Sequence, residues 1–524
     1  MNSFLSRIFS LLVLGISFSL HSVAQSADSI SSAQNQALIA EQFVFVDSTG
    51  SVISLQRASV AVAERNALSD QLASLLHHNP VSMIDRYLQP LARVYADYLY
   101  TNASAPADKR IGHGFNGVGG SADAFFRIRE NNFWGELSYY DGQARGVSSC
   151  LSSDLYLVGP FVSSDSISRS VHRTDLQVGA GFARDLDHWA VGAFFHCRSV
   201  HESADYPVRP SNFSCLLDAT FSMARLFDNY RLSLSVGGRR YSQDNYVKSD
   251  APSSSVSHSL GLGVSIPSTN SQSDAVFEGH GLNFSLNVIP RRQSSPDVSP
   301  VYASLAFSHL RLTKDCVSDS IGLQNCRLQR LNRNGYSFEV GLVAQNDFFR
   351  RFEFSAEAIH GSGRTAALDS HTVTRDATLW LSTCGEGSLV RTRLESLFRL
   401  GYALTDEEIL GSFASRLRAQ ALRAQVQLAG NWVTQGRFSF RGLARLGYDI
   451  VVDSDICMSD SDIAIIAPRV NYVTNNRLHA GADVHVGCRL SLRTSLFLIP
   501  TYSFQSFAST QSAYSLSWKL GLVF

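Results

Sequence analysis

The sequence predicts an all-β fold: an antiparallel transmembrane β-barrel of about 14 strands, within a range of roughly 12 to 16, preceded by a short helical segment. Three observations predict it. The last residues alternate between large apolar and small or polar side chains, the first residues have the pattern of an export signal, and period-two alternation persists from about residue 132 to the end. An exported chain with amphipathic strands enters a membrane only as a closed barrel, because an open sheet edge leaves backbone groups unpaired in lipid.

The C-terminal strand has the clearest alternation. Successive side chains of a strand point to opposite faces, which gives this strand a polar face of Ser515, Ser517, Lys519 and Gly521. At about 3.3 Å per residue and a tilt near 45°, the run spans about 25 Å, the height of the apolar band of an outer-membrane barrel. A terminal aromatic residue in such a strand is typical of the barrel-assembly signal of these proteins. The apolar face, which forms the predicted signal, consists of Tyr514, Leu516, Trp518, Leu520, Leu522 and Phe524.

Residues 1–24 have the three parts of a secretory signal peptide. Met1 to Arg7 is short and cationic, Ile8 to Leu20 is apolar, and Ser22 to Ala24 is a small-x-small cleavage site. An uncleaved anchor needs about 18 or more apolar residues, and this apolar run is shorter. We therefore expect cleavage after Ala24 and export.

Residues 25–110 have a different pattern. Apolar residues recur at spacings of three and four, which predicts two amphipathic helices that are separated near Pro80. We expect this helical N-terminal segment to be a plug or a short passenger-like region. Residues 111–131 are rich in Gly, Ala and Ser, which is typical of a linker.

Residues 132–524 form the predicted barrel. Candidate strands alternate with short turns and long polar loops, as in bacterial barrels, and their count closes at about 14. The region 377–402 has room for two more strands. A period-two patch from Leu260 to Ile266 breaks the up-down order, so we expect it to lie in an elaborated outer loop.

Composition narrows the possible partners. The 45 basic and 45 acidic residues leave no basic surplus for nucleic acid. Eight cysteines in an exported chain lie where disulfides form, and the candidate pair is Cys316 and Cys326, which flank a polar stretch. No CxxC or Cys/His zinc pattern occurs, and we expect neither a cofactor nor a metal.

Charged residues on the polar faces of candidate strands are predicted to line the lumen. There they set ion preference, or they pair with one another and with a plug. A metal site at His479, Asp483 and His485 is the minority reading, because such residues are ordinary in a polar lumen. The candidate lumen-lining residues are Arg231, Arg239, Glu339, Glu353, Arg441, Arg445, His479, Asp483 and His485.

The order of these strand patterns resembles the autotransporter β-domain family. The segment LQVGAGFARDLDHWAVGAFF is similar to the early hairpin of that domain, and SPVYASLAFSHLRL, SFEVGL and the final LSWKLGLVF follow in the same order over residues 132–524. The stretch 361–477 holds at least one hairpin beyond the family's usual set of about twelve strands. The region before the barrel is short for a large β-helical passenger.

These observations predict an outer-membrane barrel of autotransporter type with its N-terminal helical segment retained in or near the pore. The alternative is a porin-like channel or a surface adhesin that acts through long extracellular loops. No GxSxG, HExxH or P-loop motif occurs, so we do not expect an enzyme. The expected partners are outer-membrane lipid, the barrel-assembly and export machinery, and an unidentified host-surface ligand.

Overall fold

The structure is a computed structural model that describes most of the chain from residue 79 onward. The described residues are 79–524 without 85–90, 206–207, 229, 250–255, 268–271, 291–300, 319–325, 344–350, 366–369, 390–391, 412–413, 434–437, 492–493 and 508–510. The predicted signal peptide and most of the predicted helical segment lie outside these residues.

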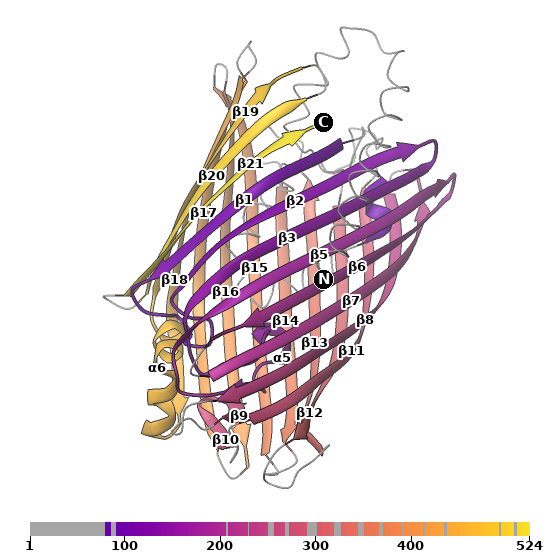
Figure 1. Ribbon diagram of the computed structural model, residues 1–524. Helices are drawn as coiled ribbons and strands as arrows, with labels where there is room; N and C mark the ends of the chain where they lie inside the picture. Colours follow the sequence, from indigo (N-terminus) through magenta and orange to yellow (C-terminus); the bar gives the residue numbers. More distant parts are fainter. Residues whose placement is uncertain are drawn as a thin grey trace.

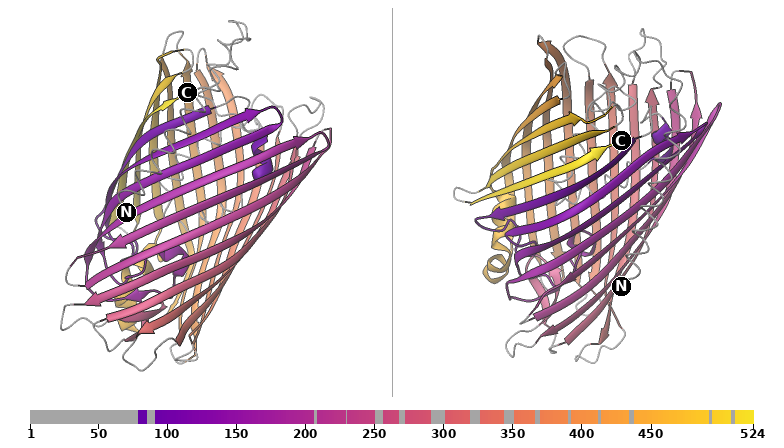
Figure 2. Two further views of the ribbon diagram at one scale, coloured as in Figure 1. Left: turned by 45° about the vertical axis from the view of Figure 1, so that its right-hand side comes forward. Right: turned by 45° about the horizontal axis from the view of Figure 1, so that its top comes forward.

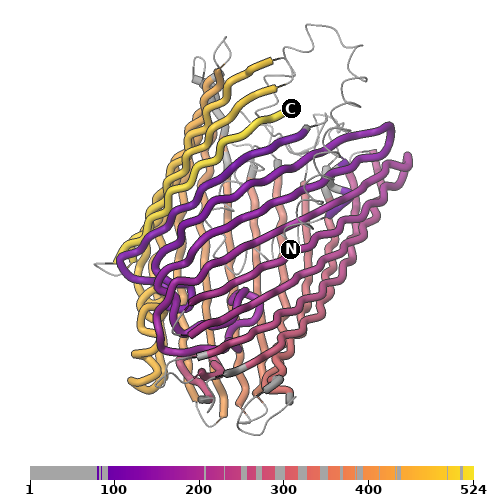
Figure 3. Tube along the Cα trace, in the orientation of Figure 1, coloured from indigo at the N-terminus to yellow at the C-terminus, as the bar shows by residue number. Residues whose placement is uncertain are grey.

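An 18-stranded antiparallel sheet forms a closed barrel (Figures 1 and 2). Each wall strand pairs with the next wall strand along the chain, as the tube in Figure 3 shows, and the last strand pairs with the first. The wall strands are β1 (Leu91–Ala103), β2 (Gly114–Ile128), β3 (Asn131–Val147), β5 (Arg169–Leu186), β6 (Trp189–Ser203), β7 (Val208–Leu226), β8 (Tyr230–Ser249), β11 (Gln272–Pro290), β12 (Val301–Ser318), β13 (Cys326–Val343), β14 (Arg351–Thr365), β15 (Ser370–Leu389), β16 (Thr392–Leu410), β17 (Ser415–Val433), β18 (Phe438–Cys457), β19 (Arg477–Arg489), β20 (Ser495–Phe507) and β21 (Gln511–Val523).

Period-two alternation gives the wall an apolar outside and a polar inside. On β7, Phe213 and Phe221 are 52% and 56% exposed, whereas the intervening Ser214 and Ser222 are buried. Side chains of alternate residues point to opposite faces of a strand, so one face meets lipid and the other the lumen. A closed antiparallel wall with an exposed apolar outer face is the architecture of outer-membrane β-barrels.

The two ends of the barrel differ. Strand β1 begins and strand β21 ends at the same end of the barrel, where the backbone groups of Ala92 and Phe524 exchange hydrogen bonds of 2.8 and 3.2 Å. We call this the turn end, the upper end in Figure 1. At the opposite end, which we call the loop end, longer connections between wall strands contain α5 (Leu155–Val158), β4 (Ser163–Ser164), β9 (Ser257–Gly261), β10 (Val264–Pro267) and α6 (Asp460–Thr474).

The strand number corrects the prediction of about 14. The additional strands are β1, β2, β15 and β16, of which the last two overlap the 377–402 region. The patch from Leu260 to Ile266 contributes to β9 and β10, which belong to a separate three-stranded sheet with β4 and not to the wall. No helix in the described part of the chain is long and apolar enough to cross a membrane.

The predicted helix and linker before residue 132 are wrong where β1 and β2 lie. On β1, Tyr95 and Leu99 face inward while Val94 and Tyr98 face outward, so both faces carry apolar residues and the alternation is hidden. On β2 the glycines that resembled a linker make room for an aromatic side chain. A Cβ at Gly119 would lie 2.5 Å from Cδ2 of Tyr140 on β3. The barrel therefore begins at Leu91 and not at residue 132.

Candidate functional site

Two inserts enter the lumen at the loop end. Insert A is residues 148–168, between β3 and β5, and insert B is residues 256–267, between β8 and β11. They pair with each other through β4 and β9, where Ser163 lies opposite His258. A backbone bond of 2.8 Å from Ser259 N to Val162 O continues this contact. The two inserts therefore form one body, which we call the plug.

Asp154 fastens insert A to one side of the wall. Its carboxylate lies 3.1 Å from Arg198 on β6 and 3.7 Å from Arg173 on β5. It also accepts hydrogen bonds from the hydroxyls of Ser214 on β7, at 2.5 Å, and Tyr241 on β8, at 3.4 Å. Asp154 is 6% exposed, so these are contacts between buried polar groups, which are stronger than the same contacts in water.

Arg333 on β13 holds the same insert from another part of the wall. Its guanidinium donates to the carbonyl oxygens of Tyr156 and Gly159, the latter at 2.8 Å. These carbonyls lie at the end of α5, where helix carbonyls have no partner within the helix. A cation at a helix C-terminus also interacts favourably with the helix dipole. Charged wall residues therefore fix both ends of this short helix.

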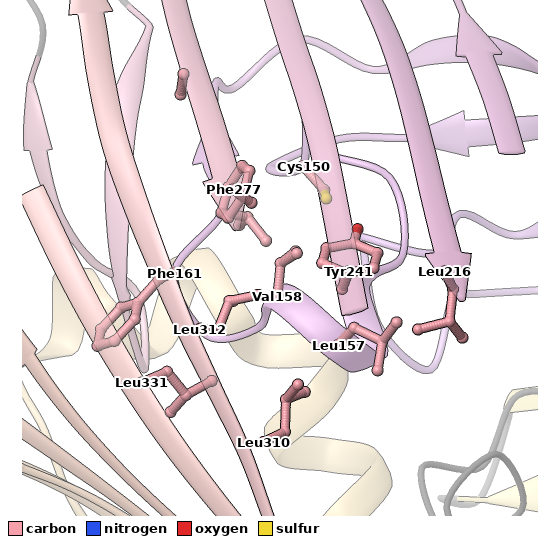
Figure 4. Close-up of a cluster of buried hydrophobic side chains, with 12 residues drawn as sticks. Cys150, Leu157, Val158, Phe161, Leu216, Tyr241, Phe277, Leu310, Leu312 and Leu331 are labelled. Carbon is pink, nitrogen blue, oxygen red and sulfur yellow. The ribbon is translucent and has the colours of Figure 1, made fainter. Parts of the chain in front are cut away.

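Apolar packing fills the space between these contacts. Figure 4 shows Leu157 of insert A beside Tyr241 and Leu216 of the wall, and Phe161 beside Leu331. The cluster joins insert A to β7, β8, β11, β12 and β13. Its buried members are Cys150, Leu157, Val158, Phe161, Val162, Leu216, Tyr241, Ala275, Phe277, Leu310, Leu312 and Leu331.

Insert B reaches a different part of the wall. Leu260, Leu262 and Val264 pack against Ile409 on β16 and Leu417 on β17. Two wall side chains donate to backbone carbonyls of the insert: Gln329 to Ser259 at 2.9 Å and Thr372 to Leu260 at 3.1 Å. The plug thus contacts wall strands from β5 round to β17.

Helix α6 covers the plug from the loop end. Val470 of α6 packs against insert B, and Arg469 forms ion pairs with Glu407 on β16 and, at 3.9 Å, with Asp108 in the connection between β1 and β2. Burial raises the pKa of Asp108, but Arg110 and Arg469 outweigh it and hold this pKa below its usual range. The contacts of Arg469 of α6 with the wall and with the β1–β2 connection are therefore ion pairs between charged groups.

Two titratable side chains of the plug are neutral at pH 7. Burial, with a smaller contribution from the Lys314 ammonium, lowers the pKa of His258 to about 3. Burial also raises the pKa of the Cys150 thiol to about 12. Neutral side chains suit a closely packed interior, because an ionised group there loses its hydration.

The turn end holds a smaller obstruction. The helix η1 (Pro80–Ile84) lies inside the lumen against β5, β6 and β7, where Val81 and Ile84 pack on three buried alanines, Ala183, Ala190 and Ala224. Asn79 donates to Ser233 at 2.7 Å, and the backbone N–H of Val81 donates to Ser222 at 3.0 Å. A Cβ at Gly192 would come within 2.9 Å of Pro80, so this glycine makes room for η1.

The structure places all nine candidate lumen-lining residues on the inner face of the wall. Most have contacts there: Arg231 donates to Val81 O at 3.4 Å, Arg239 to Asp218 at 2.6 Å, and Tyr302 donates to Glu353 at 2.7 Å. The Arg441–Glu395 distance is 3.2 Å, Arg445 pairs with Asp483, and His479 lies 3.3 Å from Asp449. Glu339 faces the lumen on β13, and His485 faces it on β19.

The metal reading of His479, Asp483 and His485 finds no support in this arrangement. His479 lies beside Asp449, and Asp483 forms an ion pair with Arg445. No cluster of His, Cys, Asp or Glu in the described part of the chain is placed to hold a metal ion. Cys316 and Cys326 are register partners on β12 and β13. The side chain of Cys326 lies outside the described residues, so their disulfide stays a prediction.

The predicted assembly signal lies on β21 and at the residue that follows it. Tyr514, Leu516, Trp518 and Leu520 are each about two-fifths exposed on the outer face, whereas Ser517 faces the lumen and is buried. Leu522 and Phe524 are half-buried. The role of these residues in assembly stays a prediction.

Sequence reasoning missed the residues that hold the plug. Asp154, Arg173, Arg198 and Arg333 come from segments far apart in the chain, and strand alternation carries no information about their contacts. A signal was present in the apolar run Leu155 to Val162, which lies between two strands where a surface loop is usually polar.

Comparison with known proteins identifies a family. Residues 80–524 match the model of the Family of unknown function (DUF6850). The chain belongs to this family. No curated protein matches the sequence.

Among solved structures the barrel is similar to large outer-membrane barrels. A FadL homologue from Pseudomonas aeruginosa has a TM-score of 0.32 and 12% identity, with 86% of this chain and 93% of that chain covered. The copper transporter OprC has a TM-score of 0.41 and 7% identity, with 82% of this chain and 80% of that chain covered. BauA, the ferric preacinetobactin receptor from Acinetobacter baumannii, has a TM-score of 0.41 and 8% identity, with 83% of this chain and 80% of that chain covered. Identities and TM-scores this low carry no function over to this chain.

The resemblance to autotransporter β-domains is wrong. The DUF6850 match includes every strand that carried the resemblance, and the wall has 18 strands instead of about twelve. The hairpin from Leu176 to Phe195 is simply β5 and β6, joined by a tight turn. Such hairpins recur in any up-and-down wall, so their order did not discriminate between barrel families.

Proposed function

We propose that this protein is an outer-membrane channel for polar solutes, with a lumen that the plug closes at the loop end and opens on demand. The proposal depends most on one observation: two long connections fold into the lumen and pair with each other, and buried charged groups of the wall hold insert A there. Such contacts break and re-form as a unit, which suits a gate with two discrete positions.

The polar inner face supports passage of polar solutes. Paired charges line it on several strands, among them Arg239 with Asp218 and Arg441 with Glu395. A lumen lined in this way holds water and admits polar or charged solutes.

The inward folding of the inserts favours a channel over a surface adhesin. An adhesin presents its long loops to the outside, whereas both inserts bury their apolar residues inside the barrel. The expectation that the protein is not an enzyme rests on the sequence motifs alone.

Shortening insert A tests the gate. Replacing residues 152–162 with a short Gly/Ser linker removes α5, Asp154 and the side chains by which insert A packs into the apolar cluster, while leaving the wall strands intact. We expect a markedly larger single-channel conductance in planar bilayers than for the wild type. Unchanged conductance would show that the plug does not limit passage.

A cross-link provides the matched control. The register partners Ser163 and His258 belong to an antiparallel pair, whose Cα separation of about 4.5–5.5 Å suits a disulfide. The variant Ser163→Cys/His258→Cys should conduct less than the wild type when oxidised and regain wild-type conductance on reduction. Equal conductance in both redox states would contradict a gate formed by the joined inserts.

Placement in the outer membrane and export through a cleaved signal peptide are part of this proposal. An arginine that faces lipid near mid-bilayer costs about 2–4 kcal/mol, whereas one that faces the lumen costs far less. Leu520→Arg should therefore reduce the amount of assembled barrel in outer-membrane fractions, and Ser517→Arg should do so much less. Equal losses would contradict the assigned lipid face of β21.

Retention of the N-terminal segment is also proposed. Asn79 to Ile84 lies in the lumen near the turn end, which is the observation that supports retention. A released fragment in the culture medium, cut before β1, would contradict retention.

A further inference from the structure

Basic residues gather on one side of the outer wall, at the loop end. They lie on β8 and on β11 to β15, and they form three neighbouring rows in which residues of adjacent strands are register partners. One row contains Arg240, His280 and Arg311. The Arg/His patch consists of Arg240, His280, His309, Arg311, Arg330, His360, Arg364, His371 and Arg375.

The Arg/His patch begins where the apolar band ends. On β12 the outward residues from the turn end are Leu305 and Phe307, followed by His309 and Arg311. On β11 the exposed apolar residues run through Leu282, the register partner of His309, and His280 follows. The patch therefore lies at the height where lipid chains give way to lipid headgroups.

Three arginines of the patch are not balanced by a neighbouring carboxylate. Arg240, Arg311 and Arg330 are exposed and have no ion pair among the described residues. On β8 and β11 to β15, Glu278 is the one carboxylate in the three rows, which run from Arg240 to Val373, from Ser242 to His371 and from Gly238 to Arg375. Arg375, at the margin of the patch, pairs with Asp406 at 2.9 Å. Arg240, Arg311 and Arg330 are therefore available to an external anion.

The next strands of the wall differ at the same height. Arg418 on β17 faces outward with Asp406 on one side and Asp455 on the other as register partners. Positive charge there is matched by carboxylates, so the surplus of positive charge on β8 and β11 to β15 does not extend to β17. Figure 1 shows these strands side by side along the wall.

We propose that the Arg/His patch binds the phosphate groups of an anionic lipid whose acyl chains lie on the apolar band below it. A guanidinium matches phosphate with two parallel hydrogen bonds. Adjacent strands are about 4.8 Å apart, so guanidiniums on neighbouring strands reach one headgroup together. The direct continuation into exposed Phe307 and Leu305 favours a lipid over a soluble anion, because one molecule then fills both surfaces.

The test uses detergent-purified full-length protein and a diphosphorylated lipid A as the probe. Bound lipid is counted by native mass spectrometry, and correct folding is checked by heat-dependent mobility on gels. Each basic side chain near an anionic lipid surface contributes about fivefold in affinity. Arg311→Gln/Arg330→Gln should therefore bind the probe roughly 25-fold more weakly than the wild type. The matched control Arg418→Gln, which removes an outward arginine at the same height, should bind within about twofold of the wild type.

Two outcomes would overturn the proposal. The wild type should lose most binding when the probe lacks its phosphates, and equal retention of both lipids would mean that only the apolar band binds. Inorganic phosphate at the same molarity should not displace the probe, and displacement would identify the patch as a site for a soluble anion. Both arms use the wild-type protein, so they decide the question even where a variant assembles poorly. Neither result depends on whether the lumen conducts.

Discussion

The two ends of the lumen are closed in different ways. At the loop end, two inserts are joined to each other; buried charged groups hold insert A, and hydrogen bonds and apolar packing hold insert B. At the turn end, one short helix rests on three alanines and forms a few hydrogen bonds. A closure that rests on buried charges costs much to break by removing one partner, whereas one that rests on a small apolar contact costs little.

The largest expected effect follows from removing Asp154. Asp154→Ala removes this carboxylate from the buried Arg198, which keeps Asp175 at 2.8 Å, and from the half-buried Arg173, and it also removes the acceptor of Ser214 and Tyr241. Breaking a buried pair costs about 3–5 kcal/mol, and we expect a value near the lower end because Arg198 retains one carboxylate. We expect insert A to leave the lumen and conductance to rise. Cys150, 5% exposed in the docked plug, provides an independent readout, because its peptide should become labelled by a maleimide.

Asp228→Ala is the control for this prediction. Asp228 is exposed at the turn between β7 and β8, so the same substitution should change neither conductance nor labelling. Labelling of Cys150 that is equal in both variants would contradict the role assigned to Asp154.

A smaller effect is expected at the turn end. Val81 is fully buried against the alanines, and truncation of such a side chain costs about 2 kcal/mol. Val81→Ala should loosen η1 and increase conductance slightly, while Cys150 stays protected. Exposure of Cys150 in this variant would show that the two closures are coupled and would remove the distinction between them.

The sequence predicts the wall strands better than it predicts what fills the lumen. Alternation alone places Phe213 outside and Arg231 inside, because the two faces of a strand meet different surroundings. It fails for β1, where Tyr95 and Val94 on opposite faces are both apolar, and for β2, where Gly119 accommodates the ring of Tyr140.

The site is beyond such reasoning for a physical reason. Arg333 meets α5 across a separation of more than 170 residues, and Asp154 meets four strands at once. These contacts depend on how the barrel closes and on where a connection folds, and neither is a local property of the chain. Local composition shows only that insert A has an apolar run, which predicts that this segment is buried inside the barrel.

The smallest expected effect is a dependence of the plug on pH. Because the pKa of the docked His258 is about 3, below the ordinary value of 6.5, the released insert binds a proton that the docked insert does not. Stability of the docked plug is therefore complete above pH 6.5 and is lost as the pH falls from 6.5 toward 3, by about 1.4 kcal/mol at pH 5.5. Conductance should rise between pH 7.5 and pH 5.5 in the wild type, and His258→Gln should flatten that rise while leaving conductance at pH 7.5 within the range of the Asp228→Ala control. Since Lys314 is the one charged group that contributes to this pKa, Lys314→Met should raise it and make the total loss of plug stability at low pH smaller, while the onset near pH 6.5 stays where the released histidine sets it. A rise of equal size in the His258→Gln variant would place the titrating group elsewhere in the barrel and leave the plug insensitive to pH.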